Sequence, residues 1–149
     1  MIRLSNMIPA HRLLDLEPTD HLPALEKLIH AALPQESSDT HFHALEEIRS
    51  KSNAKEINLG KGFALSHARL DYLTTIEIAV GLFRQETQYL KGEPVHTVFC
   101  IMIPTDKART YLTLMARLSR FLLQPGIDEI FLSGNHTRIL DALEEFDNR

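Results

Sequence analysis

Apolar residues recur at three- and four-residue intervals in several stretches of the chain, a spacing typical of amphipathic helices. This pattern predicts helices over residues 18–32, about 39–51, 105–122, 128–132 and 139–146. Asp39 or Thr40 is a suitable cap for the second helix, and Thr105 and Asp106 are expected to cap the long third one. The turn 133–135 separates the last two helices.

Other stretches follow the pattern of strands. Over residues 76–83, large aliphatic side chains recur at every second position, which predicts a strand. Residues 95–103 carry apolar side chains at both odd and even positions, which indicates a strand covered on both faces. Shorter strands are predicted over 11–16 and 63–66. The polar stretch 52–61, with its asparagines and Gly60, is predicted to be a loop.

Helices interspersed with strands predict an α/β fold in which helices pack on both faces of a central sheet. The length of 149 residues suits a single domain over 1–149. Apolar residues form 44% of the chain and charged residues 24%, close to the globular average, so the chain should bury a real core.

Charge and cysteine content exclude several classes of protein. The net charge is −4 with dispersed basic residues, which argues against nucleic-acid binding. The single cysteine, Cys100, makes neither an internal disulfide nor a cysteine metal cage, and its apolar neighbours predict a buried thiol. The N-terminus has no signal-peptide pattern, and no stretch is apolar enough for membrane insertion. We therefore expect a cytoplasmic protein.

Several chemical motifs fail on inspection. Gly60-Lys61-Gly62 lacks the third glycine and the following helix of a dinucleotide site, and Ser66 has no nucleophile-elbow glycines around it. His41 and His43 point in directions about 200° apart on a helix, which is poor geometry for a shared metal, so both are interpreted as surface histidines. We expect no cofactor and no metal.

His67 has a more informative setting. It follows a glycine loop and the predicted 63–66 strand and precedes Arg69, so it should emerge at the rim of the sheet, where ligands gather in α/β folds. A neutral imidazole near pH 7 is both a nucleophile toward phosphorus and an adequate leaving group.

The segment 59–69, LGKGFALSHAR, resembles the phosphorylation motif of fructose/mannitol-type enzyme IIA domains of the bacterial phosphotransferase system, written G-x-G-[IV]-A-[ILV]-P-H-G-[KR]. The order of elements is similar over nearly the whole chain, and the length is most like the nitrogen-regulatory branch. The resemblance implies a phosphotransferase/anion-transporter-like sandwich with a mixed sheet. It also implies that His67 receives phosphate from an HPr-like phosphocarrier protein and that the phosphorylation state signals to a regulated protein or transporter.

The same resemblance assigns roles to four further residues. Arg69 is the basic residue two positions after the histidine. An arginine about sixteen residues before the histidine is usual in the family, and here either Arg49 or Lys51 takes that place. Tyr111 stands where active members carry a second histidine at the start of the long helix.

This chain also departs from the family pattern beside His67, with Ser66 for the usual proline and Ala68 for the usual glycine. Together with Tyr111, these changes leave two functions open. One is a phosphohistidine carrier; the other is a non-catalytic IIA-like binding module that regulates a partner. Two other histidines, His96 and His136, and the nearby Asp71 are further candidates for groups close to His67.

Overall fold

A computed structural model describes residues 2–18, 21–50, 56–87 and 94–149. Within these residues the chain forms a five-stranded sheet of order β1-β4-β5-β3-β2. The strands are β1 (Leu13–Leu16), β2 (Glu56–Gly60), β3 (Phe63–Leu70), β4 (Glu77–Thr87) and β5 (Val95–Pro104). The pairs β1/β4 and β3/β5 are parallel, whereas β4/β5 and β2/β3 are antiparallel, so the sheet is mixed, as predicted.

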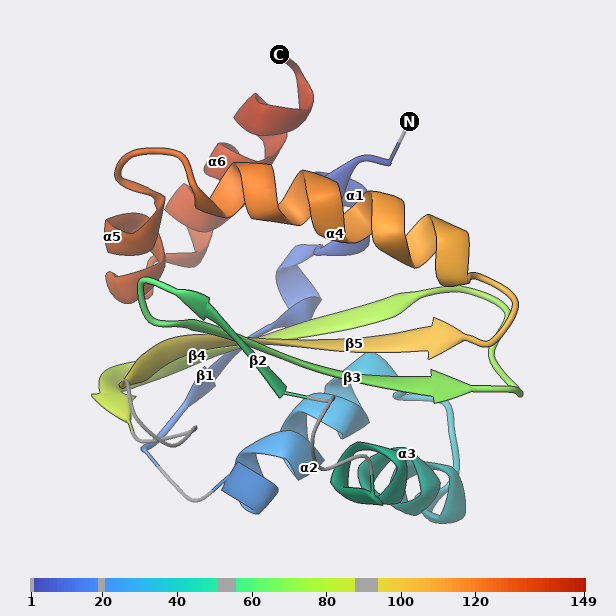
Figure 1. Cartoon of the computed structure of the whole chain (residues 1–149). Coiled ribbons are helices and arrows are strands. Elements are labelled where there is room, and N and C mark those ends of the chain that lie inside the picture. Colours follow the sequence, from blue (N-terminus) through green and yellow to red (C-terminus); the bar gives the residue numbers. More distant parts are fainter. Residues whose placement is uncertain (1, 19–20, 51–55, 88–93) are drawn as a thin grey trace.

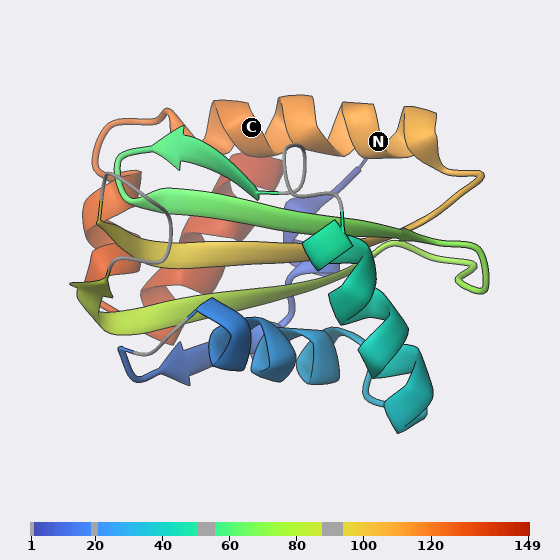
Figure 2. The same cartoon turned by 60° about the horizontal axis from the view of Figure 1, so that its bottom comes forward.

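Helices cover both faces of this sheet (Figures 1 and 2). One face carries α2 and α3, and the other carries α4, α5, α6 and the short α1. The helices are α1 (Leu4–Met7), α2 (His21–Ala32), α3 (Ser38–Ser50), α4 (Ala108–Leu122), α5 (Ile127–Leu132) and α6 (His136–Asp147), and a 3-10 turn spans Ala10–Arg12. The predicted α/β architecture is confirmed.

The central strand β5 divides the core into two layers. All ten of its residues are buried. Because side chains alternate along a strand, Val98, Cys100 and Met102 pack under α2 and α3, while Phe99 and Ile101 join the layer under α4. The apolar residues at both parities of this stretch therefore predicted its position correctly.

Two predicted boundaries were wrong. The segment expected to be a loop over 52–61 contains β2, because Ile57 and Leu59 alternate and the segment pairs with β3; residues 52–55 lie outside the described part. Neither Thr105 nor Asp106 caps α4, whose N-cap is Lys107. The backbone N–H of Lys107 donates to the carbonyl of Pro104 (3.0 Å), and this turn delays the start of the helix.

Other boundaries shift by a few residues. The first long helix begins at His21, and residues 19–20 of its predicted start lie outside the described part. The closing helix begins at His136 and not at residue 139, where the predicted apolar pattern started. The Asn135 side chain accepts a hydrogen bond from the backbone N–H of Arg138 (3.1 Å) and so caps the helix.

The two ends of the chain are joined through Asp147, whose side chain is fully buried. Its carboxylate accepts from the backbone N–H groups of Leu4 (2.9 Å) and Ser5 (2.7 Å) at the start of α1. It also forms an ion pair with Arg117 of α4 at 3.1 Å. Burial alone would raise the pKa of Asp147. The hydrogen bonds from Ser5, Leu4 and Arg117 outweigh this effect and hold the pKa below its usual value.

Candidate functional site

His67 projects from β3 toward the face covered by α4. Phe63 and Leu65 belong to the core layer under α4, while Ala64 and Ala68 belong to the opposite layer. His67 has the parity of Phe63 and Leu65 and is half-buried. The Nδ1 atom of its ring is buried.

The predicted place of His67 at the end of a 63–66 strand is wrong. The strand β3 continues to Leu70 because β5 runs parallel to all of it, pairing His67 with Ile101 and Leu70 with Pro104. In the described part of the chain, β2 pairs with Phe63 to Ser66 of β3. His67 therefore lies within β3 and is not at its terminus.

The substitution of the usual glycine by Ala68 fits this extended path. Ala68 pairs with Met102 in the ladder between β3 and β5. Among the described residues, Lys61 is the only non-glycine residue with positive φ, at 54°. The left-handed turn that would strain an alanine is therefore not required after His67.

Tyr111, on the first turns of α4, lies beside His67. The two ring centroids are 5.6 Å apart and the ring planes are tilted by 36°. Burial raises the pKa of the half-buried Tyr111 phenol, and the positive charge of Arg69 opposes the rise. Tyr111 is thus a neutral hydroxyl group near pH 7, able to donate a hydrogen bond but not to carry positive charge.

Arg69 is exposed two residues further along β3 and has the parity of His67. It borders an open cavity of about 430 Å³ that also contains Thr105, Tyr72 and, from α3, His43 and Glu47. The sequence did not indicate that His43 and Thr105 would line the same cavity as Arg69. The spacing of His43 and Glu47 by four residues on one helix face was the available signal.

Of the two candidates for the upstream cation, Arg49 is described by the structure and Lys51 is not. Arg49 is exposed at the end of α3 and forms an ion pair with Glu46 at 3.1 Å. The helix α3 packs against β3 in the layer opposite α4. Lys51 lies outside the described residues.

Two histidines considered as neighbours of His67 lie elsewhere. His96 is buried beside Gly62, at the far end of β3, and its Nε2 is 2.9 Å from the carbonyl oxygen of Lys61. Burial lowers the pKa of His96, and the hydrogen bond to Lys61 opposes this shift. His136 is bonded to Asp15 of β1 (2.8 Å), at the other edge of the sheet.

Of the remaining candidates, Cys100 and His41 have structural roles. Burial raises the pKa of the Cys100 thiol to about 12, so it is an inert core residue, as predicted. His41, expected at the surface, is partly buried with its Nε2 at 2.7 Å from the Leu33 carbonyl oxygen; His43 is exposed. In the described part of the chain no group of three His, Cys, Asp or Glu side chains is arranged for a metal ion.

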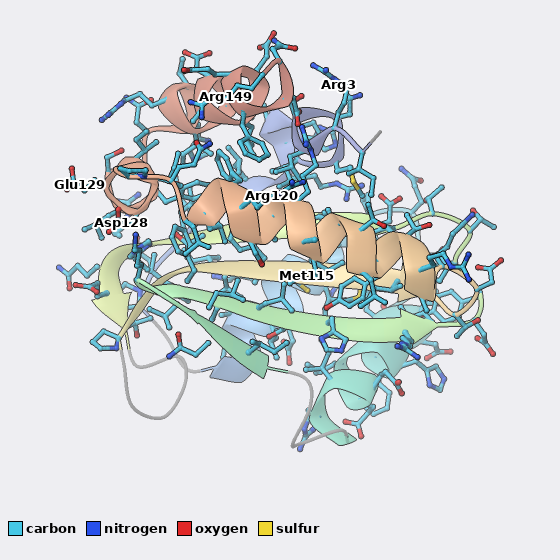
Figure 3. All side chains as sticks on the ribbon, turned by 45° about the horizontal axis from the view of Figure 1, so that its top comes forward. Arg3, Met115, Arg120, Asp128, Glu129 and Arg149 are labelled. Atoms are coloured by element: carbon cyan, nitrogen blue, oxygen red, sulfur yellow. The ribbon has the colours of Figure 1, made fainter. Side chains whose placement is uncertain are left out.

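Figure 3 shows α4 lying across β5 and β3, with Met115 labelled on its strand-facing side. The helix thus forms one wall of the surface that contains His67. Within the described residues, no helix combines the length and apolarity needed to cross a bilayer.

Comparison with known proteins gives one family. The family model described as "Phosphoenolpyruvate-dependent sugar phosphotransferase system, EIIA 2" matches residues 12–146. No curated protein gave a significant match.

Solved structures share the fold over almost the whole chain. The crystal structure of nitrogen regulatory protein IIA-Ntr from Neisseria meningitidis has a TM-score of 0.80 and 22% identity, covering 94% of this chain and 98% of that one. The mannitol-specific cryptic phosphotransferase enzyme IIA CmtB from Escherichia coli has a TM-score of 0.74 and 18% identity, covering 97% and 99%. The complex of enzyme IIAMTL and phosphorylated enzyme IIBMTL from Escherichia coli has a TM-score of 0.75 and 10% identity, covering 92% of this chain and 96% of that one.

Proposed function

This chain belongs to the EIIA 2 family of the phosphoenolpyruvate-dependent sugar phosphotransferase system, and we propose that it carries a phosphoryl group on His67. The observation that carries the proposal is the position of His67. It is the half-buried histidine of the family motif, on β3, with the Tyr111 ring 5.6 Å away and Arg69 two residues further along the strand.

The chemical step is a transfer between two imidazoles. The lone pair of His67 Nε2 attacks the phosphorus of a phosphohistidine on the donor protein, and a new N–P bond forms. The donor N–P bond breaks, and its electron pair returns to the donor imidazole. Burial of Nδ1 supports Nε2 as the attacking atom. The same step in reverse order of partners passes the phosphoryl group on.

The surrounding groups suit the oxygen charge of a phosphoryl group. Arg69 supplies a permanent positive charge and Tyr111 a neutral donor. Arg49 or Lys51 is proposed as a second cation, in line with the family pattern. Phosphoryl transfer needs chiefly alignment and charge stabilisation, so this set is chemically sufficient.

The donor in this proposal is a phosphocarrier protein of the same system, in the cytoplasm. The nitrogen-regulatory relative from Neisseria meningitidis favours a signalling role, in which the phosphorylation state of His67 controls a regulated protein or transporter. The IIA–IIB complex among the similar structures favours a protein as the recipient of either signal or phosphate.

A second candidate function rests on Tyr111. A tyrosine cannot take the positive charge of the second histidine found in active members, and Ser66 and Ala68 replace two further motif residues. These changes favour a binding module that has kept the fold but lost phosphotransfer. Such a module would recognise its partner in its unphosphorylated state only.

One experiment distinguishes the phosphohistidine carrier from the binding module. The protein is incubated with phosphoenolpyruvate, enzyme I and phosphocarrier, and its intact mass is then measured. The carrier gains the mass of one phosphoryl group, and His67→Ala does not. His136→Ala, which changes a histidine at the other sheet edge, is the matched control and should accept phosphate normally. Absence of phosphate on the folded wild-type protein would favour the binding module.

A further inference from the structure

The outward flank of α4 carries a stripe of small and apolar side chains. It consists of Leu112, Ala116, Ser119 and Leu123, spaced by four, three and four residues. Leu112 is 68% exposed and Leu123, directly after the last helical residue, is 67% exposed. A 4-3-4 spacing keeps side chains on one side of a helix and is the spacing at which two helices pack along a seam.

The edge strand β2 faces the same stripe. Leu59 packs against the core layer under α4, and Ile57, two residues earlier and so of the same parity, is 40% exposed. A cavity of about 200 Å³ lies between Leu59 of β2 and the residues Ser119 and Leu123 at the end of α4, and Lys61 also lines it. Ser119 and Leu123 of the stripe and Leu59 of β2 thus form two walls of a groove, and Leu112 and Ala116 continue the stripe on the helix side. We call this surface the α4–β2 groove.

The charges on the α4 wall of this groove are all of one sign. Between residues 107 and 123, the chain has Lys107, Arg109, Arg117 and Arg120 and no acidic residue. Arg117 is paired with Asp147, which leaves Arg109 and Arg120 on the outward face of α4 (Figure 3 labels Arg120) and Lys61 in the lining of the cavity. This basic surface contrasts with the net charge of −4 of the whole chain.

We propose that the α4–β2 groove binds an amphipathic helix of a partner protein that has acidic residues beside its apolar stripe. The two walls suit one helix, which is about 10 Å across, and the basic residues complement acidic flanks. This surface does not depend on phosphate at His67, so the proposal goes beyond the carrier function and stands apart from it.

Two other occupants fit less well. A second copy of this chain would have to offer an acidic helix with an apolar stripe. Its acidic α6 has no large exposed apolar side chain, and α3 has only Phe42, as far as the described residues go. An anionic lipid surface is flat and would repel a chain of net negative charge, whereas the groove has two walls.

The test uses two labelled synthetic peptides with leucines at 4-3-4 spacing, one flanked by glutamates and the other by lysines. Fluorescence anisotropy with the unphosphorylated full chain should show saturable binding of the glutamate peptide and not of the lysine peptide. Leu123→Asp should weaken binding roughly tenfold or more. Arg120→Glu should weaken binding of the glutamate peptide and strengthen binding of the lysine peptide. Leu132→Asp changes an exposed leucine on α5 and should leave binding unchanged.

Backbone amide NMR shifts should map the glutamate peptide to residues 57–61 and 112–123. The proposal is overturned if neither peptide saturates by about 1 mM, if both bind equally, or if the shifts lie elsewhere. A dimer in sedimentation that Leu123→Asp dissolves would assign the groove to a second copy. Binding to phosphatidylglycerol vesicles that the same variant abolishes would assign it to lipid. Because Leu123 and Arg120 are exposed, their variants should fold, and circular dichroism checks this.

Discussion

The Tyr111 ring of α4 lies 5.6 Å from the His67 ring of β3, centroid to centroid, so the hydroxyl-bearing side chain lies beside the proposed phosphorylation site. The burial that raises the pKa of Tyr111 also keeps this neighbour uncharged near pH 7. The pair therefore defines what the site can and cannot stabilise: it offers a hydrogen bond to a phosphoryl group, but a histidine there could offer a charged one.

Replacing Tyr111 by histidine should raise the rate of phosphorylation of His67 or the lifetime of its phosphoryl group. A charge-assisted hydrogen bond is worth roughly 1.5 to 3 kcal/mol, or about ten- to a hundredfold in rate. Tyr111→Phe, which removes only the hydroxyl group, should have a smaller effect of opposite sign. Rapid-quench phosphorylation assays give both values. Equal rates in all three proteins would show that Tyr111 does not limit the transfer.

Much of the fold was predictable because β5 and the helices have strong periodic patterns. The strand β2 was missed because Asn58 and Gly60 are typical of turns, while its extended conformation depends on pairing with β3. The end of β3 was missed for the same reason, since the parallel neighbour β5 extends it to Leu70. Sequence alone also could not show that His43 and Thr105 line one cavity with Arg69, because these residues come from three separate segments of the chain.

The glycine turn ahead of β3 offers a matched pair of variants. Gly60 and Gly62 have φ of 86° and 87°, so alanine is strained at both. A Cβ at Gly62 would also lie 2.6 Å from Nε2 of His96, whereas nothing lies within 4 Å of one at Gly60. Gly60→Ala should cost about 1 kcal/mol of unfolding free energy, and Gly62→Ala at least about 1 kcal/mol more. Urea denaturation measures both, and equal losses would rule out the contact with His96.

His96 should make the protein less stable in mild acid. Burial lowers its pKa in the folded state, so the unfolded chain takes up the proton first as the pH falls. Its contribution is fully present above the unfolded value of about 6.5 and decreases below it, by at most about 1.4 kcal/mol per pH unit. Unfolding free energies between pH 7 and pH 5 should therefore fall more steeply for the wild type than for His96→Gln. A steeper fall in the variant would contradict the assignment.

Asp147 should be among the most sensitive positions for stability. Changing it to asparagine leaves Arg117, whose side chain is only 12% exposed, without its counter-ion. We expect a loss of about 3 to 5 kcal/mol. Glu145→Gln removes a 74% exposed carboxylate that pairs with Arg149 and should change stability by no more than about 0.5 kcal/mol. Thermal unfolding of the two variants tests the difference, and a mild effect at Asp147 would show that α1 and α6 are held together by other contacts.

The most direct test of phosphoryl transfer is the NMR spectrum of the His67 ring nitrogens after incubation with phosphoenolpyruvate, enzyme I and phosphocarrier. Long-range proton–nitrogen correlations identify which nitrogen bears phosphorus. We predict a phosphoryl group on Nε2 of His67, with the signals of His96 and His136 showing no phosphorylation. A spectrum in which His67 stays unmodified, or in which another histidine carries the phosphate, would contradict the proposed function.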